Sequence, residues 1–277
     1  MSGGSLLVDD RDGIRTLTLN RPHRKNAIDG ALWESLHAAL VEAGDDPGLR
    51  ALVVTGAAGA FCSGADISKP GAAHPIRKMQ ALTDVALRLH ELPIPTVAKV
   101  DGVAFGAGWN LALGCDLVVA TPRSTFSQIF VRRGLSPDLG GTWLLPKLVG
   151  LQQAKRLALL ADVIDADEAL RLGLVTWVET EEKIDDFVDD LCARLVAGPP
   201  VALAQTKALL NEAGERGLRD ALASEARAQA VNFATVDAPE AFRAFAEKRE
   251  AQFTGRWALG PAGNESAPSP TSGEVHA

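Results

Sequence analysis

Two turns built from small residues carry the pattern that most strongly indicates chemistry. Each follows a short apolar run that predicts a buried strand: Ala51–Thr55 leads to Phe61–Ile67, and Thr96–Val100 leads to Gly102–Gly108. Small residues let a ligand approach the backbone, and the free N–H groups of a first helical turn then point at it. Two such turns facing each other would form an oxyanion hole with two backbone donors. Taken singly, each turn is better explained by close packing of a strand on a helix, and only the two together favour a functional site.

A single carboxylate stands in a third segment, Arg133–Thr142. Asp138 follows Pro137 and precedes a predicted helix that runs toward Leu148. An aspartate there can cap the helix by accepting hydrogen bonds from the first-turn amides. It can also act as a general acid or base at the mouth of a cavity. The segment by itself favours the N-cap.

The elements that would position these segments predict an α/β fold with parallel strands. Strands are expected at Ile14–Leu19, Ala51–Thr55, Thr96–Val100 and Leu117–Ala120. Helices are expected between them, from an N-cap at Asp29 to Gly44, over Arg77–Leu92 and around Trp109–Leu113. Strands that alternate with helices through short loops are typical of parallel sheets.

After about Gly150 the predicted elements change from alternating strands and helices to mainly helices. Only Leu174–Val178 predicts a strand there, and a helical run starts at Pro199 with breaks at Gly214, at Gly217 and near Pro239. From residue 259 to 277, nine of nineteen residues are Gly, Pro or Ser, and no apolar period survives. We therefore predict a core at 1–198, a helical region at 199–258 that is a lid or an assembly element, and a disordered tail at 259–277.

Composition excludes several classes of protein. The 277 residues hold 28 Lys and Arg against 35 Asp and Glu, and the resulting charge of −7 is unlike the basic footprint of a nucleic-acid-binding protein. Three widely spaced cysteines suggest neither a zinc site nor a disulfide framework, which favours a reduced, cytoplasmic setting. The first ten residues lack a secretory pattern, and the apolar region 100–120 is broken by Asp101, Asn110 and Asp116, so no membrane span is expected.

The order of the motifs resembles the crotonase (enoyl-CoA hydratase/isomerase) superfamily from about Leu7 to Gly255. The motifs are Asn20–Pro22 with Asn26–Ala27, Ser63–Asp66, Gly102–Gly108, Pro137–Thr142 and the late Phe245–Arg249. The resemblance implies a spiral of β-β-α units, a C-terminal helical trimerisation region and an acyl-CoA substrate. It also implies that the N–H groups of Ala65 and Ala107 bind the thioester oxygen and stabilise the enolate.

The same resemblance implies the residues that hold the substrate. The backbone at Lys25–Ala27 and Ser63–Ile67 would hold CoA, while Asp66 is expected to cap a helix. The predicted binding residues are Lys25, Ala27, Ser63, Gly64, Ala65, Asp66, Ile67, Gly106, Phe130, Pro137 and Lys248. Lys248 would reach the CoA of a neighbouring subunit in a homotrimer or hexamer, although an exposed helix charge explains it equally well. No cofactor is expected besides the CoA of the substrate, and no ligand spacing for a metal is present.

The chain departs from the pattern of family hydratases at two positions. Those enzymes carry two glutamates, and the corresponding residues here are Asn110 and Phe130. Asp138, in contrast, coincides with the catalytic aspartate of family isomerases, and its segment resembles the epoxyphenylacetyl-CoA isomerases of the phenylacetate pathway. An apolar wall containing Phe130 would raise the pKa of Asp138 toward working pH.

Three functions follow from these residues. The first is an enoyl-CoA isomerase, acting by double-bond migration or ring opening, that uses Asp138. The second is an enoyl-CoA hydratase of atypical site in fatty-acid or aromatic-acid degradation, and the third is a non-catalytic acyl-CoA-binding protein. A nucleotide-dependent kinase or dehydrogenase is disfavoured, because Gly106–Gly108 lacks the remainder of either phosphate-binding motif.

Overall fold

The main sheet organises the molecule. The computed structural model describes residues 4–68 and 74–258. Six strands pair in the order β1-β2-β3-β4-β6-β9, and all neighbours are parallel except the antiparallel pair β1 and β2. The strands are β1 (Leu6–Arg11), β2 (Ile14–Leu19), β3 (Ala51–Gly56), β4 (Thr96–Val100), β6 (Leu117–Ala120) and β9 (Trp177–Val178).

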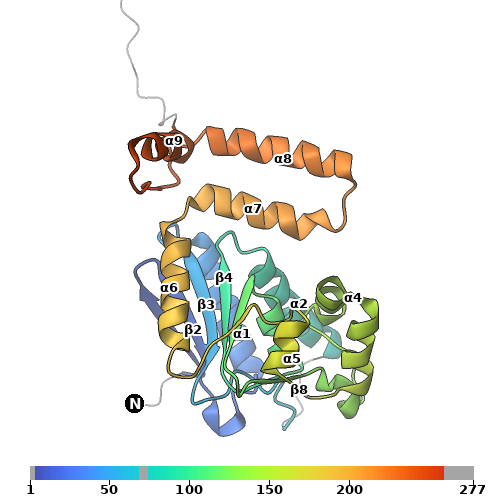
Figure 1. Ribbon diagram of the computed structural model, residues 1–277. Helices are drawn as coiled ribbons and strands as arrows, with labels where there is room; N and C mark the ends of the chain where they lie inside the picture. The colour runs from blue at the N-terminus through green and yellow to red at the C-terminus, as the bar shows by residue number, and fades with distance from the viewer. Residues whose placement is uncertain (1–3, 69–73, 259–277) are drawn as a thin grey trace, which may run out of the picture.

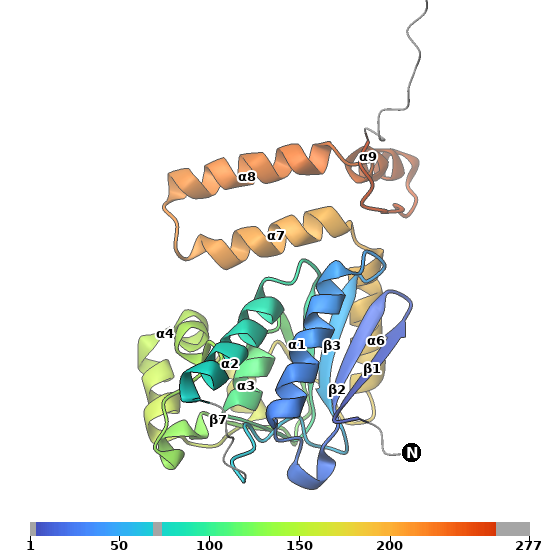
Figure 2. The ribbon, with the colours of Figure 1, turned by 180° about the vertical axis from the view of Figure 1, so that it is seen from behind.

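Helices cover both faces of this sheet. Helix α1 (Gly30–Asp45) lies on one face and α6 (Ile184–Ala197) on the other, as Figures 1 and 2 show from opposite sides. The predicted N-cap is present, because the Asp29 side chain accepts a hydrogen bond from the Leu32 N–H at 3.0 Å. Strand β3 is buried along five of its six residues, which explains its unbroken apolar sequence.

A second, smaller sheet holds the elements nearest the candidate site. Strands β5, β7 and β8 form it, with β5 and β7 parallel. Short helices η1 and η2 and helices α2 to α5 connect or flank the two sheets. Their bounds are β5 Val103–Phe105, β7 Thr125–Ser127, β8 Ile164–Asp165, η1 Pro22–Arg24, η2 Ile129–Arg133, α2 Pro75–His90, α3 Ala107–Leu113, α4 Gly141–Leu160 and α5 Ala166–Arg171. Helix α4 is kinked at Gly150, where the backbone leaves the helical conformation.

Three C-terminal helices stand apart from the two sheets. Helix α7 (Pro200–Ala213) crosses one end of the core, α8 (Leu218–Phe233) runs beside α7, and α9 (Asp237–Glu247) follows at the end of α8 (Figure 1). The breaks at Gly214 and Gly217 fall as predicted, whereas the next break comes at residues 234–236, and Pro239 lies in the first turn of α9. The boundary between a core at 1–198 and a helical region at 199–258 remains a prediction about independent units, and the tail at 259–277 lies outside the described residues.

Several sequence-based predictions of elements are wrong. The expected strand at 174–178 contracts to Trp177–Val178, and β1, β5, β7 and β8 were not predicted. The part after Gly150 therefore contains two short strands rather than one. Each missed strand except β1 has only two or three residues, which is too short for a two-residue period to show. β1 is an edge strand whose last five residues are exposed, so it lacks an apolar run.

Candidate active site

The two predicted turns pack directly against each other. The Cys62 N–H donates to the Val103 carbonyl oxygen, and the Phe105 N–H donates to the Cys62 oxygen, both at 2.9 Å. A Cβ atom on Gly108 would lie 2.4 Å from the Cys62 oxygen, so this close approach requires glycine. Burial raises the pKa of the Cys62 thiol to about 12, which keeps the thiol protonated and makes it a poor nucleophile.

Two backbone N–H groups meet at this junction. Ile28 pairs with Ala65 through the Ile28 N–H to Gly64 oxygen bond (2.9 Å) and the Asp66 N–H to Ile28 oxygen bond (2.8 Å), which leaves the Ala65 N–H directed away from that pairing. Ala107 begins α3, where helix geometry supplies no partner for the N–H. Among the described residues, neither group donates a hydrogen bond. The pair can bind a negatively charged oxygen.

Only the second of these turns leads directly into a helix. Residues 66–68 are not helical, and α2 begins only at Pro75, with His74 as its N-cap. The prediction that Asp66 caps a helix is therefore wrong. Its carboxylate instead accepts hydrogen bonds from the N–H and hydroxyl of Ser68, at 3.0 and 2.7 Å, and pairs with Arg21 at 2.9 Å. These contacts, led by the Ser68 hydroxyl, hold the pKa of Asp66 well below its ordinary value.

The residues predicted to hold CoA lie together at the first turn. The Ser63 N–H donates to the Lys25 oxygen at 3.0 Å, and the Ser63 hydroxyl donates to the Arg24 oxygen at 3.1 Å. Lys25 adopts a left-handed conformation with φ 48°, and Ala27 is buried. Ile67 is 63% exposed at the open side of the turn. Lys25, Ala27 and Ser63–Ile67 thus form one continuous wall.

Asp138 lies in a tight turn before α4. Leu139 and Gly140 both have positive φ, 49° and 80°, so the chain reverses immediately after the carboxylate. Gly140 is the N-cap of α4 and Asp138 makes no side-chain cap bond, so the N-cap interpretation is wrong. The carboxylate Oδ1 atom is buried and has no hydrogen-bond partner among the described residues. Desolvation by burial raises the pKa of Asp138 to about 6, against smaller opposite effects of a hydrogen bond from its own backbone N–H and of Lys78.

A buried pair of amides holds the Asp138 turn from behind. The Asn110 Nδ2 atom donates to the Asp138 backbone oxygen at 2.8 Å, and the Gln128 Nε2 atom donates to Asn110 Oδ1 at 2.7 Å. Asn110 and Gln128 are 1% and 0% exposed. A Cβ atom on Gly141 would lie 2.3 Å from Asn110 Nδ2, so the start of α4 also depends on this contact. Sequence reasoning missed Gln128, and no motif marks that residue, because it follows the three-residue strand β7.

Of the remaining predicted residues, Phe130 and Pro137 lie close to the two turns or to Asp138, whereas Lys248 does not. The ring of Phe130 lies against Gly106, where a Cβ atom would be 3.6 Å from the Phe130 Cζ atom. Pro137 adjoins Asp138 and is half-buried. Lys248 follows the last residue of α9, which Figure 1 places at the end of α8 and on the side of α7 away from the sheets, so the described chain does not bring Lys248 to the site.

The described residues contain neither a cluster of metal-binding side chains nor a membrane-spanning helix. Residues 4–68 and 74–258 contain no group of three or more His, Cys, Asp and Glu side chains that is able to hold a metal ion. No helix in these ranges is both long and apolar enough to cross a membrane.

Two backbone N–H groups without partners in the described chain, at Ala65 and Ala107, and the half-buried carboxyl group of Asp138 are thus the groups of this region that could carry chemistry. A family model described as enoyl-CoA hydratase/isomerase matches residues 9–256. The chain therefore belongs to the enoyl-CoA hydratase/isomerase family, the crotonase superfamily, and the predicted family and fold class are confirmed.

Individual relatives carry different names. The chain is 36% identical to the 1,2-epoxyphenylacetyl-CoA isomerase of Escherichia coli, over 88% of this chain and 96% of that protein. It is 35% identical to the crotonyl-CoA hydratase of Syntrophomonas wolfei, over 91% of this chain and 99% of that protein. The structure of an enoyl-CoA hydratase from Mycobacterium smegmatis superimposes with a TM-score of 0.85 at 33% identity, over 91% of this chain and 99% of that one. The chain is thus an enzyme of this family, and the names do not separate isomerase from hydratase.

Proposed function

We propose that this enzyme isomerises an enoyl-CoA thioester, with Asp138 as its acid and base. The N–H groups of Ala65 and Ala107 bind the thioester oxygen and stabilise the enolate. Asp138 takes the proton from C2 and returns it to C4, so the double bond moves and the carboxylate is regenerated. Opening of a strained ring next to the same enolate is the related reaction of this site.

The observation that carries this proposal is the state of the Asp138 carboxyl. It is half-buried, one oxygen lacks a partner, and its pKa is raised to about 6, close to the value a general base needs near neutral pH. The two positions that hold glutamates in family hydratases are occupied by Asn110 and Phe130. One carboxylate is enough for a proton shuttle, whereas adding water requires one group to activate it and another to protonate the α-carbon.

The rest of the substrate would lie along the wall at the first turn. Lys25, Ala27 and Ser63–Ile67 hold the CoA nucleotide and pantetheine, and Gly106, Phe130 and Pro137 border the acyl group. The enzyme needs no cofactor besides the CoA of its substrate, and it works in the cytoplasm. Lys248 completes the CoA site of a neighbouring subunit.

A hydratase of atypical site is the second candidate. The name of the crotonyl-CoA hydratase of Syntrophomonas wolfei favours it. In this reaction Asp138 and a water molecule would perform both proton transfers. A non-catalytic acyl-CoA-binding protein would retain the two amides and need no carboxylate at Asp138.

The test is turnover of two thioesters by the wild type and the Asp138→Asn variant. A 3-enoyl-CoA and a trans-2-enoyl-CoA are incubated separately, and the products are resolved by chromatography. We expect double-bond migration without hydration in the wild type and a loss of at least about 10²-fold in the variant, since a positioned acid or base contributes about 10²–10⁴-fold.

Other outcomes separate the alternatives. Hydration that survives Asp138→Asn would contradict the role of Asp138 in any reaction. Tight binding of both thioesters without turnover would favour the binding protein. Asp84→Asn, which changes an exposed aspartate on α2, is the matched control and should leave turnover unchanged.

A further inference from the structure

The two candidate oxyanion donors are held in place in different ways. Ala107 is the first residue of α3, so the geometry of that helix orients its N–H group. Ala65 has no such support, because residues 66–68 are not helical. The direction of the Ala65 N–H group therefore depends on tertiary contacts of the first turn.

Backbone pairing with Ile28 fixes the peptides on either side of Ala65. The Gly64 oxygen accepts a hydrogen bond from the Ile28 N–H at 2.9 Å, and the Asp66 N–H donates to the Ile28 oxygen at 2.8 Å. This pairing is an isolated bridge outside the two sheets. Because no further ladder bonds hold the segment, side-chain contacts must add to its support.

The Asp66 carboxylate ties the segment to Arg21. Its Oδ2 atom lies 2.9 Å from Arg21 Nη2, while Oδ1 accepts the two hydrogen bonds from Ser68. The side chains of Arg21 and Asp66 are 14% and 11% exposed, so their attraction is screened less than that of a surface pair. The Ser68 hydroxyl and Arg21 keep the pKa of Asp66 below its ordinary value, so the carboxylate is ionised at neutral pH.

Arg21 is anchored at two further points. Its Nη1 atom donates to the Ala27 backbone oxygen, and its Nη2 atom lies 3.0 Å from Oδ2 of Asp29. Asp29 is also the N-cap of α1. One guanidinium group thus joins the predicted CoA wall at Ala27, the start of α1 and the first turn at Asp66.

The backbone of Arg21 is fixed as well. Its N–H donates to Asn26 Oδ1 at 2.9 Å, and Asn26 Nδ2 donates to the backbone oxygens of Ala57 and Ala60 at 2.9 and 2.6 Å. Asn26 is fully buried and has a φ of 56°, a conformation that asparagine adopts more readily than most residues. The guanidinium group therefore starts from a backbone that is tied to the end of β3.

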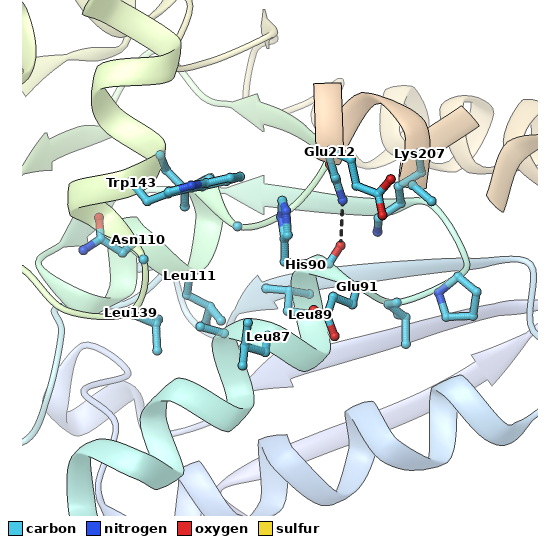
Figure 3. A pocket seen from close by; sticks show the side chains of 18 of the residues that line it. Leu87, Leu89, His90, Glu91, Asn110, Leu111, Leu139, Trp143, Lys207 and Glu212 are labelled. Atoms are coloured by element: carbon cyan, nitrogen blue, oxygen red, sulfur yellow. Dashed lines mark hydrogen bonds between the residues drawn. The ribbon is translucent and has the colours of Figure 1, made fainter. Parts of the chain in front are cut away.

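The large cavity beside α3 does not contribute to this support. Its volume is about 720 Å³, and Figure 3 shows that α2, α3, α4 and α7 line it, with Leu111 and Lys207 on opposite sides. Neither Ala65 nor Ala107 is among the lining residues. The side-chain support of the Ala65 segment therefore comes from Arg21 and Asp66.

We propose that Arg21 is a positioning residue for the oxyanion hole, and that through Asp66 it holds the Ala65 N–H group at the place of the thioester oxygen. A misplacement of about 1 Å can cost about 10²-fold in rate, so the direction of this donor matters. The planar guanidinium group reaches Ala27, Asp29 and Asp66 at once, whereas a lysine would offer a single point charge. The inference rests on the proposed function in one respect, the role of the Ala65 and Ala107 amides as donors.

A chromophoric thioester reports on the two donors without turnover. In dimethylaminocinnamoyl-CoA, an electron-donating nitrogen is conjugated with the thioester carbonyl, so hydrogen bonds to the carbonyl oxygen shift the absorption to longer wavelength. The ring carbon next to the double bond carries no hydrogen, so the bond cannot migrate. We expect a red shift when this ester binds the full-length wild type. The affinity for free CoA, which has no carbonyl at this position, is measured in parallel by calorimetry.

Variants of the pair should reduce the red shift. Asp66→Asn removes the charge that faces Arg21 but leaves the contacts of Arg21 with Ala27 and Asp29. We expect at least half of the shift to be lost, while the dissociation constant of free CoA changes by less than about threefold, equivalent to less than about 0.7 kcal/mol. Arg21→Met should also lose the shift, and Arg21→Lys should retain part of it.

Arg15→Met is the matched control. Arg15 lies on β2, its side chain is as well buried as that of Arg21, and it pairs with Asp10 at 2.7 Å without contacting either turn. This variant should lose stability, because a nearly buried ion pair is broken, and should keep the full red shift. A thermal melt of each variant measures the loss of stability and shows whether the protein folds.

Two results would overturn the inference alone. One is a full red shift in a folded Asp66→Asn or Arg21→Met variant, and the other is an equal loss of the shift in Arg15→Met. A wild type that binds the ester without any shift would overturn the proposed oxyanion hole and the inference with it. A wild type that shows the shift but does not turn over a 3-enoyl-CoA would contradict only the proposed isomerisation.

Discussion

Asp138 links the chemistry of the site to the stability of the fold. Its folded-state pKa of about 6 exceeds the ordinary value of 3.8, so folding favours the protonated carboxyl. The stability from this preference is complete below about pH 4 and is lost as the pH rises through about 6. The ionised form, which the proposed reaction uses as its base, is therefore the less stable one.

Asp138→Asn should consequently stabilise the protein in a pH-dependent way. Because Asp138 is only half-buried, we expect a gain of about 1–2 kcal/mol at about pH 7.5 and almost none at about pH 4. Denaturant unfolding of both proteins at the two pH values measures it. A gain of equal size at both values would mean that ionisation is not its cause. In the wild type, kcat/KM should fall below about pH 6, as the base becomes protonated.

Asn110 is a positioning residue for Asp138. Asn110→Ala leaves Gln128 Nε2 without its partner, at a cost of about 1–3 kcal/mol, and removes one of the two donors to the Asp138 backbone oxygen, which keeps the Gly141 N–H at 2.9 Å. We expect lower stability and a shifted pH dependence of kcat/KM, since the turn that buries Asp138 loses its support. Gln128→Ala and the double variant complete a mutant cycle, in which additive effects would contradict a coupled pair.

At the scale of elements, the two turns pack against each other because Gly108 has no side chain and so allows the backbone of Cys62 to approach closely. Gly108→Ala would place a Cβ atom 2.4 Å from the Cys62 oxygen, so the loops must separate. We expect a loss of about 1–3 kcal/mol in stability, together with most of the activity, because the Ala65 and Ala107 amides move apart. Thermal melts and turnover measure the two losses.

Gly30→Ala is the matched control for that substitution. Nothing lies within 4 Å of a Cβ atom at Gly30, the first residue of α1. A change to alanine there should be neutral or stabilise the protein by about 0.4–1 kcal/mol. If Gly108→Ala behaved like this control, the close approach of the two turns would not be required for the site.

Sequence reasoning found the long elements and the two turns, but not everything that joins them. Strands β3 and β4 were found because they are buried runs between turn signals. Asp66 was mistaken for a helix N-cap, because the pairing of Ile28 with Ala65 joins segments far apart in the chain. Burial of Asp138 and the Asn110–Gln128 bond are likewise products of tertiary packing, so no local pattern contains them.

At the scale of the whole molecule, the C-terminal helices leave large apolar side chains uncovered. Phe233, Phe242, Phe245 and Trp257 are 56–87% exposed, and Phe245 is 87% exposed. Such a group of exposed aromatic residues is typical of an interface. We therefore expect self-association through α8 and α9, in line with the predicted homotrimer or hexamer.

Phe245→Asp tests this assembly. A charge at the centre of an apolar interface should convert the oligomer to monomers, as measured by sedimentation velocity. His37→Asp, on α1 and outside the C-terminal helices, is a comparison that should leave the assembly intact. If assembly also supplies Lys248 to a neighbouring site, the monomer should bind CoA esters more weakly. A Phe245→Asp protein that stays oligomeric would place the interface elsewhere.

The two donors at Ala65 and Ala107 belong to the main chain, and this has a consequence for how the enzyme can change over generations. Substituting either alanine alters a side chain but leaves the N–H group in place. In the proposed reaction, activation of the thioester is thus protected from most point mutations, whereas proton transfer depends on a carboxylate that a single substitution can replace. New reactions can arise by exchanging residues such as Asp138 or Asn110 while thioester activation is inherited unchanged.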